Sequence, residues 1–121
     1  MKRNLILLFT LLLVSSCYGA ELTKEQVDKI TSAIYRAEGG SQTRYPYGIR
    51  SVRVRDSSEA RMFCVRSIKN NYSRWESAGK PGCFIVFMGK RYCPPTKHAL
   101  NSNWVHNVKA DLGERFLKSL K

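Results

Sequence analysis

The spacing of apolar residues is the feature that most constrains the fold of this chain. From about Ser58 to the ESAGKPG segment at 76–82, apolar side chains follow one another at steps of four, four, four and three residues: Ala60, Cys64, Ile68, Tyr72 and Trp75. An α-helix turns once every 3.6 residues, so side chains at this spacing share one face. The pattern therefore predicts a long helix with a buried face. The residues 56–58, Asp-Ser-Ser, offer good caps for its start.

A shorter helix is predicted before it, from about Lys24 to Ala37. Thr23 and Gln26 have the spacing of a capping box, in which each side chain bonds the backbone N–H of the other residue. The apolar face of this helix consists of Val27, Ile30, Ile34 and Ala37. Two glycines, at 39 and 40, follow Glu38 and are expected to end the helix.

The second half of the chain predicts two more helices. Residues 83–93 are apolar nearly all round at their start, which is typical of a central buried helix, and two prolines stop it. The last helix is expected to begin near Asn103, with Trp104, Val108, Leu112 and Phe116 on its apolar face. Between the first two helices, IRSVRVR at 49–55 alternates apolar and basic residues, so a short strand is expected there. The sequence thus predicts a small, mainly α, single-domain fold with a short irregular or β segment after the first helix.

The first 20 residues have the pattern of an export signal, which leaves residues 21–121 as the folded domain. Lys2 and Arg3 precede an apolar run from Leu5 to Val14, and that run is too short to span a bilayer, which takes about 20 residues. VSSC at 14–17 fits a lipobox, which would make Cys17 a lipidated N-terminus. Cleavage after Gly19 or Ala20 is the alternative, and both stay open. We therefore expect a periplasmic or secreted protein, or a lipoprotein anchored in the outer membrane by its lipid alone.

The charge of the chain points to an anionic partner. Lys and Arg number 21 against 9 Asp and Glu, for a net charge of +12, and loss of Lys2 and Arg3 with the signal lowers this to +10. For an exported protein, cell-wall polymers and acidic glycans are commoner polyanions than nucleic acid. The sequence contains no nucleic-acid-binding motif. We expect a monomer whose partner is an anionic polymer of the cell envelope or an envelope protein, and not nucleic acid.

Three cysteines remain after the signal, and an exported compartment permits a disulfide between two of them. Cys64 and Cys93 are the preferred pair, which leaves Cys83 as the odd thiol. The cysteines and the two histidines lack the spacing of a metal site, so neither a metal nor another cofactor is expected.

Glu38 is the candidate catalytic residue, because it is the single carboxylate between residues 33 and 50 and ends the first predicted helix. Partial burial and the negative end of a helix both disfavour the carboxylate form, which raises the pKa. Glycoside cleavage needs such a protonated acid for the leaving oxygen. Tyr45 and Tyr47 supply flat faces for sugar rings, whereas Arg36 or Arg44 would oppose the shift. The alternative interpretation is that Glu-Gly-Gly is only a helix stop.

AEGG at 37–40 resembles the Glu-Ser-Gly motif of the lysozyme-like lytic transglycosylases and goose-type lysozymes. YGIRS at 47–51 looks like a degenerate form of their Gly-Leu-Met-Gln segment. FIVFMGKRYCPP and NSNWVHNV are similar to the later half of small lysozyme-like bacterial and phage proteins. The resemblance extends from Leu22 to Leu120 and implies a lysozyme-like fold. It also implies that Glu38 is the acid/base, that Gly48 and Ile49 line the cleft, and that the partner is the glycan strands of peptidoglycan.

The sequence departs from that family at three places. Gly39 stands where the family has Ser, Ser51 stands near the position of the Gln, and no Tyr-Asn-Ala-Gly motif is present. A two-carboxylate hydrolase would need a second acid, but Asp56 and Glu59 are better explained as helix-capping residues. The resemblance then implies single-glutamate chemistry that forms a 1,6-anhydro sugar. The alternative is a non-catalytic, basic envelope protein that binds wall polymer or a protein partner.

Overall fold

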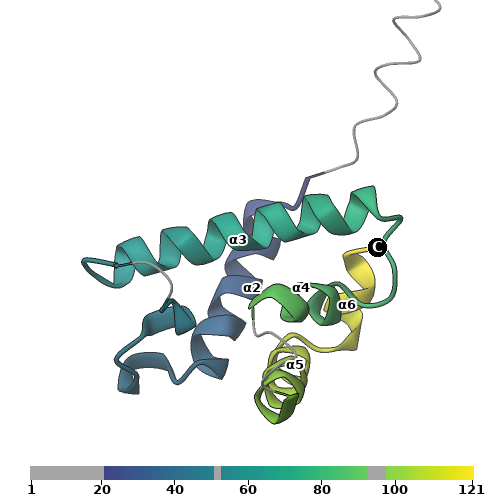
Figure 1. Ribbon diagram of the computed structural model, residues 1–121. Coiled ribbons are helices and arrows are strands. Elements are labelled where there is room, and N and C mark those ends of the chain that lie inside the picture. The colour runs from purple at the N-terminus through teal and green to yellow at the C-terminus, as the bar shows by residue number, and fades with distance from the viewer. Residues whose placement is uncertain (1–20, 51–52, 93–97) are drawn as a thin grey trace, which may run out of the picture.

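The computed structural model describes residues 21–50, 53–92 and 98–121, and every regular element in these ranges is helical (Figure 1). The elements in order are α2 (Lys24–Ala37), the short 3₁₀ helices η2 (Gly40–Gln42) and η3 (Pro46–Gly48), α3 (Ser57–Ser77), α4 (Phe84–Tyr92), α5 (His98–Leu112) and α6 (Glu114–Ser119). The mainly α prediction is therefore confirmed. The export signal predicted at 1–20 lies outside the described residues. No helix in the described ranges is both long and apolar enough to cross a membrane.

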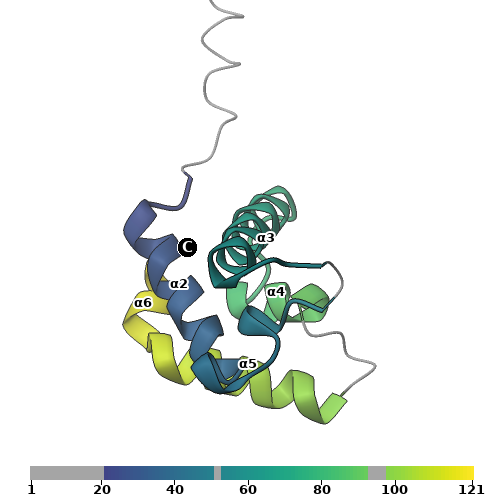
Figure 2. The ribbon, with the colours of Figure 1, turned by 90° about the vertical axis from the view of Figure 1, so that its left-hand side faces the viewer.

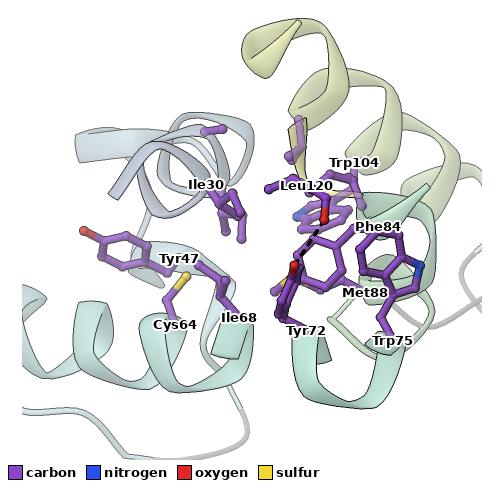
Figure 3. Close-up of a cluster of buried hydrophobic side chains, with 14 of the residues drawn as sticks. Ile30, Tyr47, Cys64, Ile68, Tyr72, Trp75, Phe84, Met88, Trp104 and Leu120 are labelled. Carbon is purple, nitrogen blue, oxygen red and sulfur yellow. Dashed lines mark hydrogen bonds between the residues drawn. The ribbon is translucent and has the colours of Figure 1, made fainter. Parts of the chain in front are cut away.

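The helices pack around one hydrophobic core. Helix α2 contacts both α3 and α5, and α4 lies between α3 and α5 (Figures 1 and 2). The centre of the core is aromatic, because Trp75 and Phe84 are almost fully buried and Tyr72 packs on both rings (Figure 3). The hydroxyl of Tyr72 donates a hydrogen bond to the carbonyl oxygen of Leu120 at 3.1 Å, which joins the C-terminus to α3.

The first two predicted helices are confirmed in detail. The capping box at α2 is present, with Thr23 N–H donating to Gln26 Oε1 at 2.9 Å and Gln26 N–H donating to Thr23 Oγ1 at 3.1 Å. Helix α3 begins at Ser57, where the Asp56 carboxylate accepts the N–H of Glu59 at 2.8 Å. The predicted stripe of α3 is buried along its whole length, from Ala60 to Trp75.

The last two predicted helices differ from the structure. Val86 of α4 is 39% exposed, so this helix is buried on one face and not all round. Helix α5 begins at His98 rather than near Asn103. The apolar pattern continues through Leu112 and Phe116, but Gly113 takes a φ of 82° and divides the predicted helix into α5 and α6. Such a φ suits glycine, which has no Cβ, and side-chain periodicity carries no sign of it.

The segment between α2 and α3 is irregular, as expected, but contains no strand among its described residues. Two 3₁₀ helices occupy its first part, and residues 49–50 and 53–55 have no β-structure. Residues 51–52 lie outside the described ranges. In Figure 2, which looks at the left-hand side of Figure 1, this segment faces the viewer. The Tyr-Pro-Tyr-Gly sequence at 45–48 favours turns, which explains why the alternation after it does not begin a strand there.

Candidate active site around Glu38

Glu38 is held at the C-terminal end of α2, where its backbone N–H still donates to the carbonyl oxygen of Ile34 at 3.0 Å. Gly39 follows with a φ of 105°, so the chain leaves the helix at once. The backbone of Gly48 then returns against the carboxyl group of Glu38. A Cβ added at Gly48 would lie 2.5 Å from Cδ of Glu38 and 2.6 and 2.7 Å from its two carboxyl oxygens. Any other residue at this position would therefore displace the Glu38 carboxyl group.

The turn that carries Gly48 is strained and is fixed by α4. Tyr47 has a φ of 59°, an unusual value for a residue with a side chain, and Gly48 follows with a φ of 69°. The N–H of Gly48 donates to the carbonyl oxygen of Tyr45 at 2.8 Å. The hydroxyl of Tyr92, the last residue of α4, donates to the carbonyl oxygen of Tyr47. Helix α4 thus holds the peptide that packs against Glu38.

Trp104 of α5 brings an indole ring to the same place. Its side chain is 5% exposed and stacks on Tyr92, with ring centroids 5.3 Å apart and 25° between the planes. The indole N–H lies beside the Glu38 carboxyl group and favours its charged form. Even so, the indole N–H has no partner with full hydrogen-bond geometry. The C-terminal ends of α2 and α4, the middle of α5 and one turn therefore meet around one half-buried carboxyl group.

The electrostatics favour the protonated form of Glu38. Burial raises the pKa of Glu38 and is the largest effect, while the Trp104 N–H and the positive charge of Arg50 lower it by less. The predicted direction of the shift is thus found. The opposing arginine is Arg50 and not Arg36 or Arg44, because Arg36 instead binds Asp111 of α5 through two contacts of 2.6 and 2.7 Å.

The predicted substrate-binding residues have different surroundings. Gly48 lies against Glu38 as expected, and Ile49 is partly buried against the core. Tyr45 is 39% exposed, with the Arg50 guanidinium 4.8 Å above its ring. Tyr47 is 7% exposed and packs on Tyr35, with centroids 5.1 Å apart. The ring of Tyr47 therefore belongs to the core and offers no flat face to a sugar, so its contribution to the site is its backbone.

The two other acids considered for catalysis have structural roles. Asp56 caps α3 as expected, whereas the side chain of Glu59 makes no cap and binds Arg55 at 2.7 Å. Among the residues that the structure describes, no group of three His, Cys, Asp or Glu side chains is arranged to hold a metal ion. Glu38 is thus the carboxyl group in this segment that has no structural ion pair or cap.

Cys64, which was predicted to pair with Cys93, is a free, buried thiol. Cys93 lies outside the described residues, and Cys83 is free and half-buried. Cys64 belongs to α3, where the helical spacing points its side chain into the core and away from the surface. Burial raises the pKa of Cys64 to about 12, so the thiol stays protonated at neutral pH.

A wide surface hollow of about 740 Å³ runs along α2 and the end of α5, and Glu38 is not among its lining residues. Most of its charged groups are paired: Arg36 with Asp111, Lys29 with Glu25, and Asp28 with Arg61 of α3. This hollow is therefore a weaker candidate for chemistry than the site around Glu38.

Sequence reasoning assigned Trp104 to the core and did not place it beside Glu38. Its burial is confirmed, but the helical pattern of α5 does not reveal where the indole N–H lies. For Tyr92, the sequence indicates a position at the end of a buried helix from which its side chain could reach a cleft, but not its bond to Tyr47. Trp104 and Tyr92 both lie in segments that carry the family resemblance, NSNWVHNV and GKRYCPP. That resemblance was the sequence feature that could have assigned them to the site.

Comparison with protein-family models, curated proteins and solved structures finds no significant match to this chain. The geometry and chemistry of the site are therefore the basis for a functional proposal.

Proposed function

We propose that this protein is an exported, lysozyme-like enzyme that cleaves the glycan strands of peptidoglycan, with Glu38 as its general acid and base. The observation that carries the proposal is the setting of Glu38. Its half-buried carboxyl group lies against the backbone of Gly48 and beside the Trp104 indole, and burial raises its pKa. A carboxylic acid that stays protonated near neutral pH is what glycosidic bond cleavage requires.

In the first step, protonated Glu38 gives its proton to the glycosidic oxygen. The bond from that oxygen to the anomeric carbon breaks, and the oxygen leaves with the electron pair. The N-acetyl group of the substrate assists at the anomeric carbon. In the second step, the Glu38 carboxylate takes the proton of the C6 hydroxyl as that oxygen bonds to the anomeric carbon, which gives a 1,6-anhydro sugar. One carboxyl group suffices, which suits the structural roles of Asp56 and Glu59.

The surface beside Glu38 supports a sugar polymer as the substrate. Tyr45 is partly exposed, with the Arg50 guanidinium over its ring, and a sugar would pack on the exposed part of this pair. The positive charge of Arg50 also reaches Glu38. Together with the net charge of the chain, these groups favour an anionic glycan.

The test is muropeptide release from purified peptidoglycan by the mature chain, read by mass spectrometry, beside Glu38→Gln. Glu114→Gln, at an exposed position on α6, is the matched control. We expect anhydro-muropeptides from the wild type and the control and a loss of at least about a hundredfold in Glu38→Gln. Reducing-end products that are lost in Glu38→Gln would mean hydrolysis.

The second candidate is a non-catalytic protein that binds wall polymer, and the strong positive charge favours it. It predicts no products from any variant, with the wild type and Glu38→Gln both sedimenting with the wall. That outcome would refute the enzymatic proposal.

A further inference from the structure

The indole N–H of Trp104 is buried, and no residue in the described part of the chain accepts it with full hydrogen-bond geometry. Buried N–H groups in folded proteins are nearly always paired, because an unpaired one loses its bond to water and gains nothing in return. The carboxyl group beside it, Glu38, is the group whose charged form it favours. An ionised carboxylate accepts hydrogen bonds more strongly than a protonated carboxyl group. The lack of a partner for the indole N–H is thus explained if this N–H donates to the ionised form of Glu38.

The indole ring of Trp104 is held in place by its packing. It stacks on Tyr92, and α4 approaches α5 closely at Gly89, where an added Cβ would lie 3.2 Å from Cζ3 of Trp104. The side-chain amide of Asn101 donates to the carbonyl oxygen of Gly89 at 3.0 Å, which joins the two helices at this point. These contacts hold the ring, so its N–H is directed before any charge forms on Glu38.

The other polar groups around Glu38 are less suited to this role. Arg50 is an exposed cation from the segment after η3, and its side chain lies over Tyr45. Tyr92 of α4 already donates its hydroxyl to the carbonyl oxygen of Tyr47. Tyr92 and Cys64 of α3 both remain neutral, because burial raises the pKa of each.

We infer that Trp104 is a positioning residue, whose indole N–H donates a hydrogen bond to the Glu38 carboxylate that forms when the acid has given up its proton. The catalytic part of this inference rests on the proposed function of Glu38, whereas the contact between Trp104 and Glu38 is independent of that function. In the cleavage reaction, the bond would strengthen as charge develops on Glu38 and would keep the carboxylate aimed for the second proton transfer.

The contact is tested in the intact mature chain by NMR, since the chain has two tryptophans and so two indole N–H signals. Trp75 is the internal control, because its N–H donates to the carbonyl oxygen of Pro81 at 3.2 Å. We expect the Trp104 signal to shift with pH at the midpoint of the Glu38 carboxyl carbon, and to stop shifting in Glu38→Gln. The Trp75 signal should stay constant. A Trp104 signal that stays constant while Glu38 titrates would overturn the inference.

Trp104→Phe keeps an aromatic ring and removes the N–H, with Trp75→Phe as the matched loss of a buried indole. In Trp104→Phe, the pKa of Glu38 should rise further and kcat should fall by about ten- to a hundredfold with little change in KM. The pH above which kcat declines should also move upward. Trp75→Phe should change neither the pKa of Glu38 nor kcat.

If the Trp104 indole signal titrates in a chain that releases no muropeptides, the contact is supported and the enzymatic proposal is refuted. If the wild type cleaves peptidoglycan but the pKa of Glu38 is unchanged in Trp104→Phe, the enzymatic proposal is supported and the contact is refuted.

Discussion

At the scale of single residues, the site depends on what Gly48 lacks. Its backbone occupies the place where any side chain would meet the Glu38 carboxyl group, and its φ of 69° is also one that glycine tolerates best. Tyr47, just before it, takes a similar φ despite its side chain, and the burial of its ring offsets that strain. Backbone strain of this kind, held by packing, is often found at functional sites.

Gly48→Ala should therefore lose both stability and activity. Its matched control is Gly79→Ala, because Gly79 has a φ of 85° with no atom within 4 Å of an added Cβ. Both variants carry the backbone cost, about 1 kcal/mol, and Gly48→Ala should lose a further 1–3 kcal/mol, roughly, from the clash with Glu38. Urea unfolding measures the difference, and muropeptide release should fall only in Gly48→Ala. Equal losses of stability in the two variants would contradict the close contact.

At the scale of elements, the sequence predicted the helices better than the segment between them. The capping residues and apolar stripes located α2 and α3, because helix formation there follows local spacing. The break at Gly113 and the turn at Tyr47 depend on backbone angles that side-chain periodicity does not record. Glu38 and Gly48 were recognised as candidates from their motifs. The contribution of Tyr92 and Trp104 depends on how α4 and α5 pack, which no local pattern in the sequence states.

Tyr92→Phe tests whether α4 holds η3 in place. The variant removes the hydroxyl that bonds the Tyr47 carbonyl oxygen. Tyr72→Phe is the control, because its buried hydroxyl also bonds a backbone carbonyl, at Leu120, within the core. Each variant should lose about 1–2 kcal/mol of unfolding free energy, whereas kcat for muropeptide release should fall only in Tyr92→Phe. If Tyr72→Phe reduced kcat as much, the effect would come from general loosening and not from the turn.

At the scale of the whole molecule, Glu38 has a raised pKa although the chain is strongly basic. The net charge of +12 by itself favours carboxylates, and Arg50 acts on Glu38 in that direction. Other acids are used to join helices, as Asp28 of α2 does by binding Arg61 of α3 at 2.8 Å. For Glu38, burial outweighs the surrounding positive charge. The burial that raises the pKa of Glu38 therefore costs the fold some stability at neutral pH.

That loss of stability is measurable, and its sign follows from the raised pKa. Because the pKa of Glu38 is higher in the folded than in the unfolded chain, its contribution to stability is complete below the unfolded value of about 4.3. The contribution is lost as pH rises through the folded pKa. Glu38→Gln carries no such ionisation, so it should be more stable than the wild type at pH 7, and the difference should shrink as pH falls toward 4. Glu114→Gln, at its exposed site, should follow the wild type. Urea unfolding of the three proteins across this pH range gives the comparison. The opposite result would be a Glu38→Gln variant whose stability relative to the wild type falls between pH 4 and pH 7. That result would show that the fold stabilises Glu38 in its charged form and does not hold it as an acid.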